Sequence, residues 1–216
     1  TSDIDLVVYT AAVKLDNPEL VRATELGIPI VERGEFLGEI TKLFKDTIGI
    51  AGTHGKTSTT SMVTCAFIEA GLDPSIQVGA NLNVLDNTNY RVGDSKYFVI
   101  EACEYCESYL NFVQRSAIVL NIDNDHLDYF KNIDNIQKSF EKYVSLLPED
   151  GYLVLNRDDE RCYNLRHSSK ANIISVGATN EADWHYENVT FDDDGYPTYD
   201  VYKLNDFKGK ITLKVA

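Results

Sequence analysis

Apolar positions in this chain fall into short continuous runs that alternate with helical repeats. The strongest continuous runs are at residues 48–51, 96–102, 116–122 and 152–155. Runs of this kind are typical of strands covered on both faces, as in a parallel sheet between helices. Apolar residues recur with helical spacing at 62–70 and 133–147. The alternation predicts an α/β fold: a mostly parallel sheet with helices on both faces.

The two ends of the chain extend this pattern differently. Near the start, residues 4–9 and 28–31 read as strands, and Asn17-Pro18 reads as the start of a helix that ends near residue 26. A second helical pattern covers residues 34–44, and residues 80–94 read as a polar loop. Near the end, residues 184–191 and 198–204 alternate around an acidic turn, and 211–215 reads as a third strand. The last strands predict a small C-terminal antiparallel β extension.

A glycine-containing stretch, G-T-H-G-K-T at residues 52–57, lies between the run at 48–51 and a helical pattern. Strand, glycine loop, lysine, hydroxyl and helix form the arrangement of a P-loop nucleotide-binding site, in which backbone N–H groups cradle phosphate. The general pattern G-x-x-x-x-G-K-[ST] would place its first glycine where Ile50 stands, so an ordinary strand-to-helix turn is the alternative. Lys56, which we expect to be exposed, would contact phosphate, and the Thr57 hydroxyl would face Mg²⁺. The predicted nucleotide-binding residues are Gly52, Thr53, His54, Gly55, Lys56, Thr57 and Ser58.

Composition narrows the possible partners. The net charge is −14, from 20 basic and 34 acidic residues, which argues against nucleic acid or an anionic membrane as the main partner. The sequence has no apolar run of about 18 residues and no basic N-terminal signal region. Its four cysteines form no regular disulfide framework, and the sequence therefore predicts a cytoplasmic protein.

Cys103 and Cys106 form a C-x-x-C motif with two possible meanings. A zinc site would need a second pair of ligands at similar spacing, and the sequence has none. A redox motif remains possible, but two free thiols beside a site are the favoured interpretation.

Two acidic motifs follow strong strand candidates: E-A-C-E-Y-C-E-S at 101–108 and N-I-D-N-D-H-L-D at 121–128. The carboxyl ends of parallel strands meet at one edge of a sheet, where ligands bind. Glu101 is an oxygen ligand of the kind that Mg²⁺ prefers, and His126 could complete a metal site. The alternatives are a helix N-cap for Glu101 and a surface histidine for His126. The prediction is that Thr57, Glu101 and His126 share a metal site, with Lys56, Glu101 and His126 as catalytic residues.

Five motifs in order carry a resemblance to a known family: Y-T-A-A, D-N-P-E-L, G-T-H-G-K-T, E-A-C-E-Y-C-E-S and N-I-D-N-D-H-L-D-Y-F. Together they resemble the Mur ligase superfamily, although Cys103 and Cys106 replace two family aspartates. The resemblance implies an ATP- and Mg²⁺-dependent enzyme of bacterial peptidoglycan synthesis that joins L-alanine to the lactyl carboxylate of UDP-N-acetylmuramate. It also implies that Lys56 binds phosphate, that Thr57 and Glu101 hold one Mg²⁺, and that His126 helps to hold a second.

The resemblance also implies a domain organisation. Residues 1–46 would be the last part of a Rossmann-like UDP-sugar-binding domain, and residues 47–216 an incomplete central ATP-binding domain. We expect a C-terminal ligase domain to be absent from this chain and the chain alone to be inactive. Two alternatives stay open: a sister ligase that attaches a recycled peptide to UDP-N-acetylmuramate, and a nucleotide-binding module without ligase activity.

Overall fold

A computed structural model describes residues 3–214 of the chain. Within them, ten strands form one sheet in the order β12-β11-β10-β9-β8-β7-β3-β6-β4-β5. Its centre consists of β3 (Asp46–Ala51), β6 (Tyr97–Glu101), β7 (Ser116–Val119), β8 (Tyr152–Asn156) and β9 (Asn172–Gly177). Neighbouring strands from β4 to β10 in this order are all parallel. The predicted fold class is confirmed, because a parallel centre continues into antiparallel outer strands.

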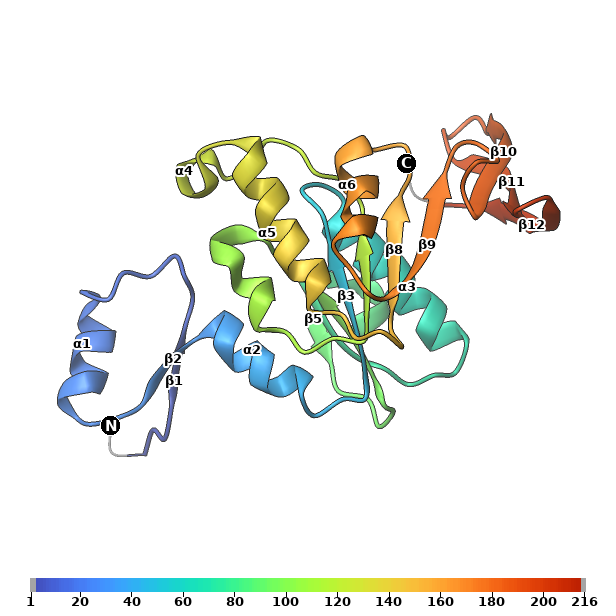
Figure 1. Cartoon of the computed structure of the whole chain (residues 1–216). Coiled ribbons are helices and arrows are strands. Elements are labelled where there is room, and N and C mark those ends of the chain that lie inside the picture. The colour runs from blue at the N-terminus through green and yellow to red at the C-terminus, as the bar shows by residue number, and fades with distance from the viewer. Residues whose placement is uncertain (1–2, 215–216) are drawn as a thin grey trace.

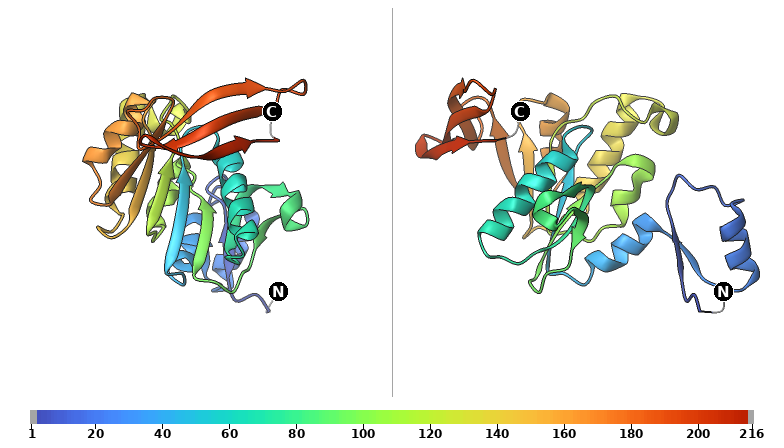
Figure 2. Two further views of the ribbon diagram at one scale, coloured as in Figure 1. Left: turned by 90° about the vertical axis from the view of Figure 1, so that its right-hand side faces the viewer. Right: turned by 180° about the vertical axis from the view of Figure 1, so that it is seen from behind.

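Helices cover both faces of the sheet (Figure 1 and Figure 2). On one face α3 (Lys56–Glu69) packs over a cluster that includes Ile50, Ile76 and Val99. On the other face lie α5 (Ile133–Ser145) and the short helices η2 (Tyr105–Asn111), α6 (Glu160–Asn164) and η3 (Leu165–His167). The short helix α4 (Leu127–Phe130) precedes α5. Two apolar layers therefore enclose the central strands, which explains their nearly continuous apolar sequence.

Two buried tyrosine hydroxyls in the larger core have hydrogen-bond partners. The rings of Tyr109 and Tyr143 stack with centroids 4.3 Å apart. The Tyr143 hydroxyl donates to Gln114 Oε1 over 2.8 Å, and the Tyr109 hydroxyl shares a 2.9 Å hydrogen bond with Ser139. Burial raises the pKa of both phenols. These hydrogen bonds offset the cost of burying the two hydroxyls and fix η2 against α5.

The N-terminal segment forms a separate two-stranded parallel sheet from β1 (Val7–Tyr9) and β2 (Ile30–Glu32), with α1 (Pro18–Glu25) between them (Figure 1). The Asn17 side chain accepts a 2.9 Å hydrogen bond from the Glu19 N–H, which confirms the predicted cap. The next helix, α2 (Arg33–Thr41), packs Leu37 and Ile40 against the larger core. Helix α2 therefore joins the N-terminal segment to the main sheet.

The prediction of a loop at residues 80–94 is wrong. The structure has β4 (Ser75–Leu82), the turn η1 (Asn83–Leu85) and β5 (Thr88–Arg91), and β5 pairs antiparallel with β4. Asp86 and Asn87 have positive φ of 54° and 61°, which Asp and Asn adopt more readily than most residues. The chain therefore reverses tightly there, and β5, an outer strand with polar side chains, carries no apolar pattern to reveal it.

The C-terminal extension consists of β10 (Trp184–Phe191), β11 (Pro197–Lys203) and β12 (Asp206–Thr212), paired antiparallel as predicted (Figure 1). The predicted third strand at 211–215 starts too late, because the chain reverses at Leu204, which has φ 54°. Position 215 of that prediction lies outside the described residues. No helix within residues 3–214 is both long enough and apolar enough to span a membrane.

Candidate functional site

The glycine loop follows β3 and leads directly into α3, as the sequence predicts. Gly52 has φ 140°, and a Cβ there would lie 3.0 Å from the Leu120 Cβ. Gly55 has φ 82° and is the N-cap of α3. Both positions need glycine for backbone conformation, and Gly52 also needs it for space. The loop is thus specified by local conformation and by close contact with the chain after β7.

Unsatisfied backbone N–H groups mark the start of α3. Gly55 provides no side-chain cap, and the first helical hydrogen bond of the turn joins the Thr59 N–H to the Gly55 carbonyl. Among residues 3–214, the structure gives no acceptor for the N–H groups of Lys56, Thr57 and Ser58. Three free N–H groups at a helix N-terminus form a site suited to a phosphate.

Two predicted nucleotide-binding residues use their N–H groups elsewhere. The Thr53 N–H donates to the Asn121 carbonyl over 3.1 Å, and the His54 N–H donates to Asn121 Oδ1 over 2.8 Å. The Asn121 amide in turn donates to the His54 carbonyl over 3.0 Å. Asn121, the first residue of the second acidic motif, therefore fixes the loop. Sequence reasoning did not assign it this role.

Lys56 is mostly buried, and the expectation that it is exposed is wrong. Its side chain is 12% exposed. The ammonium donates to the carbonyls of Gly52 and Thr53 over 2.7 and 3.0 Å and to Glu104 Oε1 over 3.1 Å. The lysine folds back over its own loop because buried carbonyls and a buried carboxylate attract it.

Glu101 is the last residue of β6 and lies beside Ile50 of β3 in the sheet register. Its Oε1 accepts a 3.0 Å hydrogen bond from the Thr57 hydroxyl, and its Oε2 accepts one of 2.7 Å from the Gly79 N–H. The N-cap alternative for Glu101 is wrong, because these are its partners. The paired hydroxyl and carboxylate oxygens are donors that suit Mg²⁺.

His126 lies at the start of α4 with φ 49°, and its side chain is 34% exposed. Its Nε2 is 3.8 Å from Glu104 Oε1, and its Nδ1 is 3.9 Å from Asp125 Oδ1. One ligand atom from each of these three residues fits within 4.8 Å of the others. His126 thus lies with Glu104 and Asp125, whereas Thr57 lies with Glu101. A metal site shared by Thr57, Glu101 and His126 stays a prediction.

Glu104 is the residue that sequence reasoning missed. Its side chain is 2% exposed, and it lies between Lys56 and His126. Within η2, which follows it, Cys106 and Glu107 have positive φ of 52° and 55° and interrupt the helical backbone. A second acid within E-A-C-E was visible in the sequence, but nothing there indicated which of the two carboxylates turns inward.

Cys103 and Cys106 are both free thiols on either side of Glu104. Burial raises the pKa of the Cys103 thiol, with the neighbouring Glu104 adding to the effect. A raised pKa disfavours the thiolate that redox and metal chemistry require. The redox alternative therefore loses support, and two free thiols beside a site remain the better interpretation.

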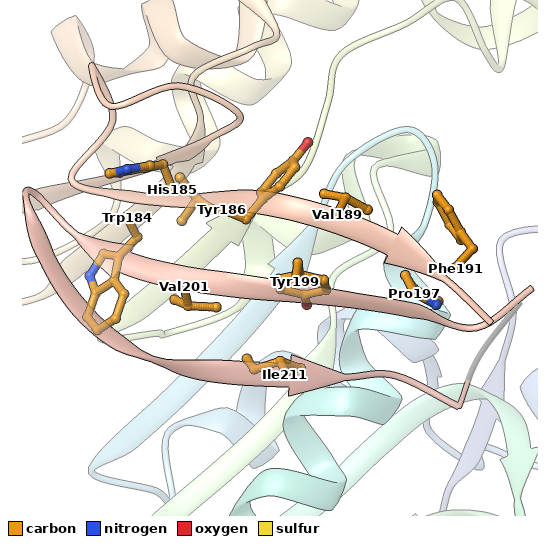
Figure 3. A pocket seen from close by; sticks show the side chains of 10 residues that line it. Trp184, His185, Tyr186, Val189, Phe191, Pro197, Tyr199, Val201 and Ile211 are labelled. Carbon is orange, nitrogen blue, oxygen red and sulfur yellow. The ribbon is translucent and has the colours of Figure 1, made fainter.

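The loop borders a shallow depression of about 340 Å³. Every predicted nucleotide-binding residue except Gly52 lines it, together with Glu101. A larger hollow of about 540 Å³ lies over the outer strands β10–β12 (Figure 3). Its lining is mainly aliphatic and aromatic, with Trp184, Tyr186, Phe191 and Tyr199 among the residues. The groups suited to binding phosphate, the free N–H groups and the carboxylate, therefore lie at the smaller depression.

Comparison with known proteins identifies similar sequences along the whole chain. The family model "Mur ligase middle domain" matches residues 50–216, and the model "Mur ligase family, catalytic domain" matches residues 1–45. A UDP-N-acetylmuramate–L-alanine ligase of Clostridium kluyveri is 49% identical over 100% of this chain and 47% of its own length. Its counterpart from Caldanaerobacter subterraneus subsp. tengcongensis is 44% identical over 98% of this chain and 46% of its own length. The chain therefore spans about half the length of the curated relatives it matches.

Solved structures give a consistent picture. The UDP-N-acetylmuramate-alanine ligase MurC of Thermotoga maritima superposes with a TM-score of 0.85 at 27% identity, covering 98% of this chain and 47% of that one. The MurF ligase of the same organism, solved in complex with ADP, has a TM-score of 0.68 at 14% identity and covers 98% of this chain and 56% of its own. The second likeness shows the fold alone.

Proposed function

Because this chain belongs to the Mur ligase family, we propose that the protein carrying it joins L-alanine to the lactyl carboxylate of UDP-N-acetylmuramate at the expense of ATP. The observation that carries the proposal is the loop: three free N–H groups, Lys56 and the Thr57–Glu101 pair meet at one depression. The names of the relatives supply the substrates. A bacterial cytoplasmic location and a role in peptidoglycan precursor synthesis are part of the same proposal.

The chemistry requires the γ-phosphoryl group of ATP to pass to the lactyl carboxylate. The alanine amine then attacks the acyl phosphate, and the products are an amide, ADP and phosphate. Charge grows on the transferred group, and positioned cations and N–H groups offset it. In this proposal the N–H groups of Lys56, Thr57 and Ser58 hold phosphate oxygens, and the Lys56 ammonium approaches them from the loop.

Mg²⁺ fits the residues present. The Thr57 hydroxyl and the Glu101 carboxylate supply two hard oxygen donors 3.0 Å apart, and Gly79 orients Glu101 through its N–H. Bound there, Mg²⁺ would neutralise charge on the phosphates. His126, together with Glu104 and Asp125, supplies the donors for a second cation in the same proposal.

Turnover with defined substrates tests the proposal. The protein carrying this chain is incubated with ATP, Mg²⁺, UDP-N-acetylmuramate and L-alanine, and phosphate release and amide product are measured. We expect product only when all four are present. Glu101→Gln removes the carboxylate charge and should lower the rate at least a hundredfold. Glu107→Gln is the matched control. Glu107 lies in the same segment, but its carboxylate pairs with Lys142, 3.3 Å away, and not with a residue of the loop.

A second amine substrate separates the proposal from its nearest alternative. A structure of similar fold is named for ligation of L-alanyl-γ-D-glutamyl-meso-diaminopimelate to UDP-N-acetylmuramate. Replacing L-alanine by that tripeptide should abolish product. Product with the tripeptide and none with L-alanine would assign the sister activity instead. Nucleotide binding without either product would leave only a binding module.

A further inference from the structure

Lys56 has no proton available for a phosphate in this structure. A lysine ammonium has three N–H donors. Here they donate to the Gly52 carbonyl, the Thr53 carbonyl and Glu104 Oε1, at 2.7, 3.0 and 3.1 Å. Lys56 must give up at least one of these partners before it can contact a nucleotide.

Glu104 is the partner that also carries charge. Its Oε2 lies 2.9 Å from the same Lys56 nitrogen, and the carboxylate is almost fully shielded from solvent. The ion pair cancels the positive charge of the loop where a phosphate would bind. Glu101 and Asp125 add further acidic groups nearby, and within residues 3–214 no lysine or arginine besides Lys56 lines the depression. The site is therefore unfavourable for a phosphate anion that arrives without a cation.

We propose that Glu104 competes with nucleotide phosphate for Lys56, and so makes nucleotide binding depend on a divalent cation. Without a cation, a phosphate must displace a buried carboxylate from Lys56 and then remain beside it. With a cation bound at the carboxylates, the negative charge of Glu104 is offset and Lys56 is free to move to the phosphate. This role deepens the proposed function and rests on it, since it concerns the same nucleotide site.

The position of Glu104 supports the competition. It lies between the loop and His126, 3.8 Å from His126 Nε2, so the residue that holds Lys56 also belongs to the candidate second cation site. A cation held by Glu104, Asp125 and His126 would pull the Glu104 carboxylate away from Lys56. Cation binding and release of the lysine are thus expected to be coupled through one side chain.

Calorimetric titration with ADP tests this, because it reports affinity without turnover. The protein carrying this chain is titrated in EDTA and again in excess Mg²⁺. For Glu104→Gln we expect ADP affinity in EDTA to rise about tenfold, the effect of removing one partly screened unit charge beside the ligand. The ratio of affinities with and without Mg²⁺ should fall by a similar factor. Glu107→Gln, which changes the same charge outside the site, should leave both affinities unchanged.

Further variants make the outcome decisive. Glu104→Asp keeps the charge but shortens its reach toward Lys56. This variant should bind ADP in EDTA more tightly than the wild type, and it replaces Glu104→Gln in the test if that variant does not fold. In a Lys56→Met background, Glu104→Gln should change affinity less than in the wild type, because no lysine remains to be released. Unchanged or weaker ADP binding by Glu104→Gln in EDTA overturns the competition. A wild-type protein that fails to bind ADP even with Mg²⁺ overturns the proposed function instead.

Discussion

The Lys56–Glu104 ion pair predicts that the phosphate-loop lysine also stabilises the fold. The two side chains are 12% and 2% exposed, so water screens them little. Removing one partner of a buried pair leaves an uncompensated charge and typically costs about 3–5 kcal/mol. Lys56→Ala should therefore lower the free energy of unfolding by about that amount and Tm by roughly 6–20 °C, in addition to abolishing turnover.

A double-mutant cycle attributes the loss to the stranded carboxylate. Glu104→Gln in the Lys56→Ala background removes the unpaired charge, so the double variant should be more stable than Lys56→Ala by about 2 kcal/mol. Lys142→Ala is the matched control: its pair with Glu107 is exposed, with Lys142 at 64%, and should cost less than about 1 kcal/mol.

Urea unfolding followed by far-ultraviolet circular dichroism measures the wild type, the two single variants, the double variant and Lys142→Ala. A loss below about 1 kcal/mol for Lys56→Ala would refute the reasoning. A double variant no more stable than Lys56→Ala would refute it equally, because the cost would then not lie in Glu104. Either result would mean that Glu104 relaxes toward solvent when its partner is removed.

Three further predictions follow from packing, capping and burial. Phe140→Ala empties a fully buried position and should cost about 3–5 kcal/mol in urea unfolding; a loss under 1 kcal/mol would contradict its place in the core. Asn132→Ala removes the 3.0 Å hydrogen bond that caps α5 and should lower the free energy of unfolding by about 1 kcal/mol in the same assay. An unchanged free energy of unfolding would contradict the capping role. Burial raises the pKa of Cys162 from 9.0 to about 12, so its stabilising contribution is full below pH 9 and is lost as pH rises toward 12. Iodoacetamide at pH 8.5 should alkylate the exposed Cys65 and leave native Cys162 intact by mass spectrometry, and rapid labelling of Cys162 would contradict its burial.

Much of the fold could be predicted because local patterns agree with their surroundings. The central strands are apolar on both faces, and α5 has a clear apolar stripe, so each position indicates its own environment. The edge strand β5 lacked any such pattern, since its residues are polar and its turn depends on Asp86 and Asn87. The start of β12 was missed for a similar reason: its residues are mostly exposed and mostly polar, so they carry no apolar alternation.

The sequence by itself determined the phosphate loop, its position between a strand and a helix, and the motifs that bring Glu101 and His126 to the same edge of the sheet. Those features are local: glycines where φ is positive, a helix start, and residues at strand ends. Only the tertiary structure decided the partners of each side chain. Lys56 is buried against Glu104, Thr57 pairs with Glu101, His126 turns to Glu104, and Asn121 holds the loop. The Thr57–Glu101 contact joins residues 44 positions apart, and the contact of Asn121 with the loop joins residues 67 positions apart. A buried charge pairs with an opposite charge that only the packing of such distant segments brings close.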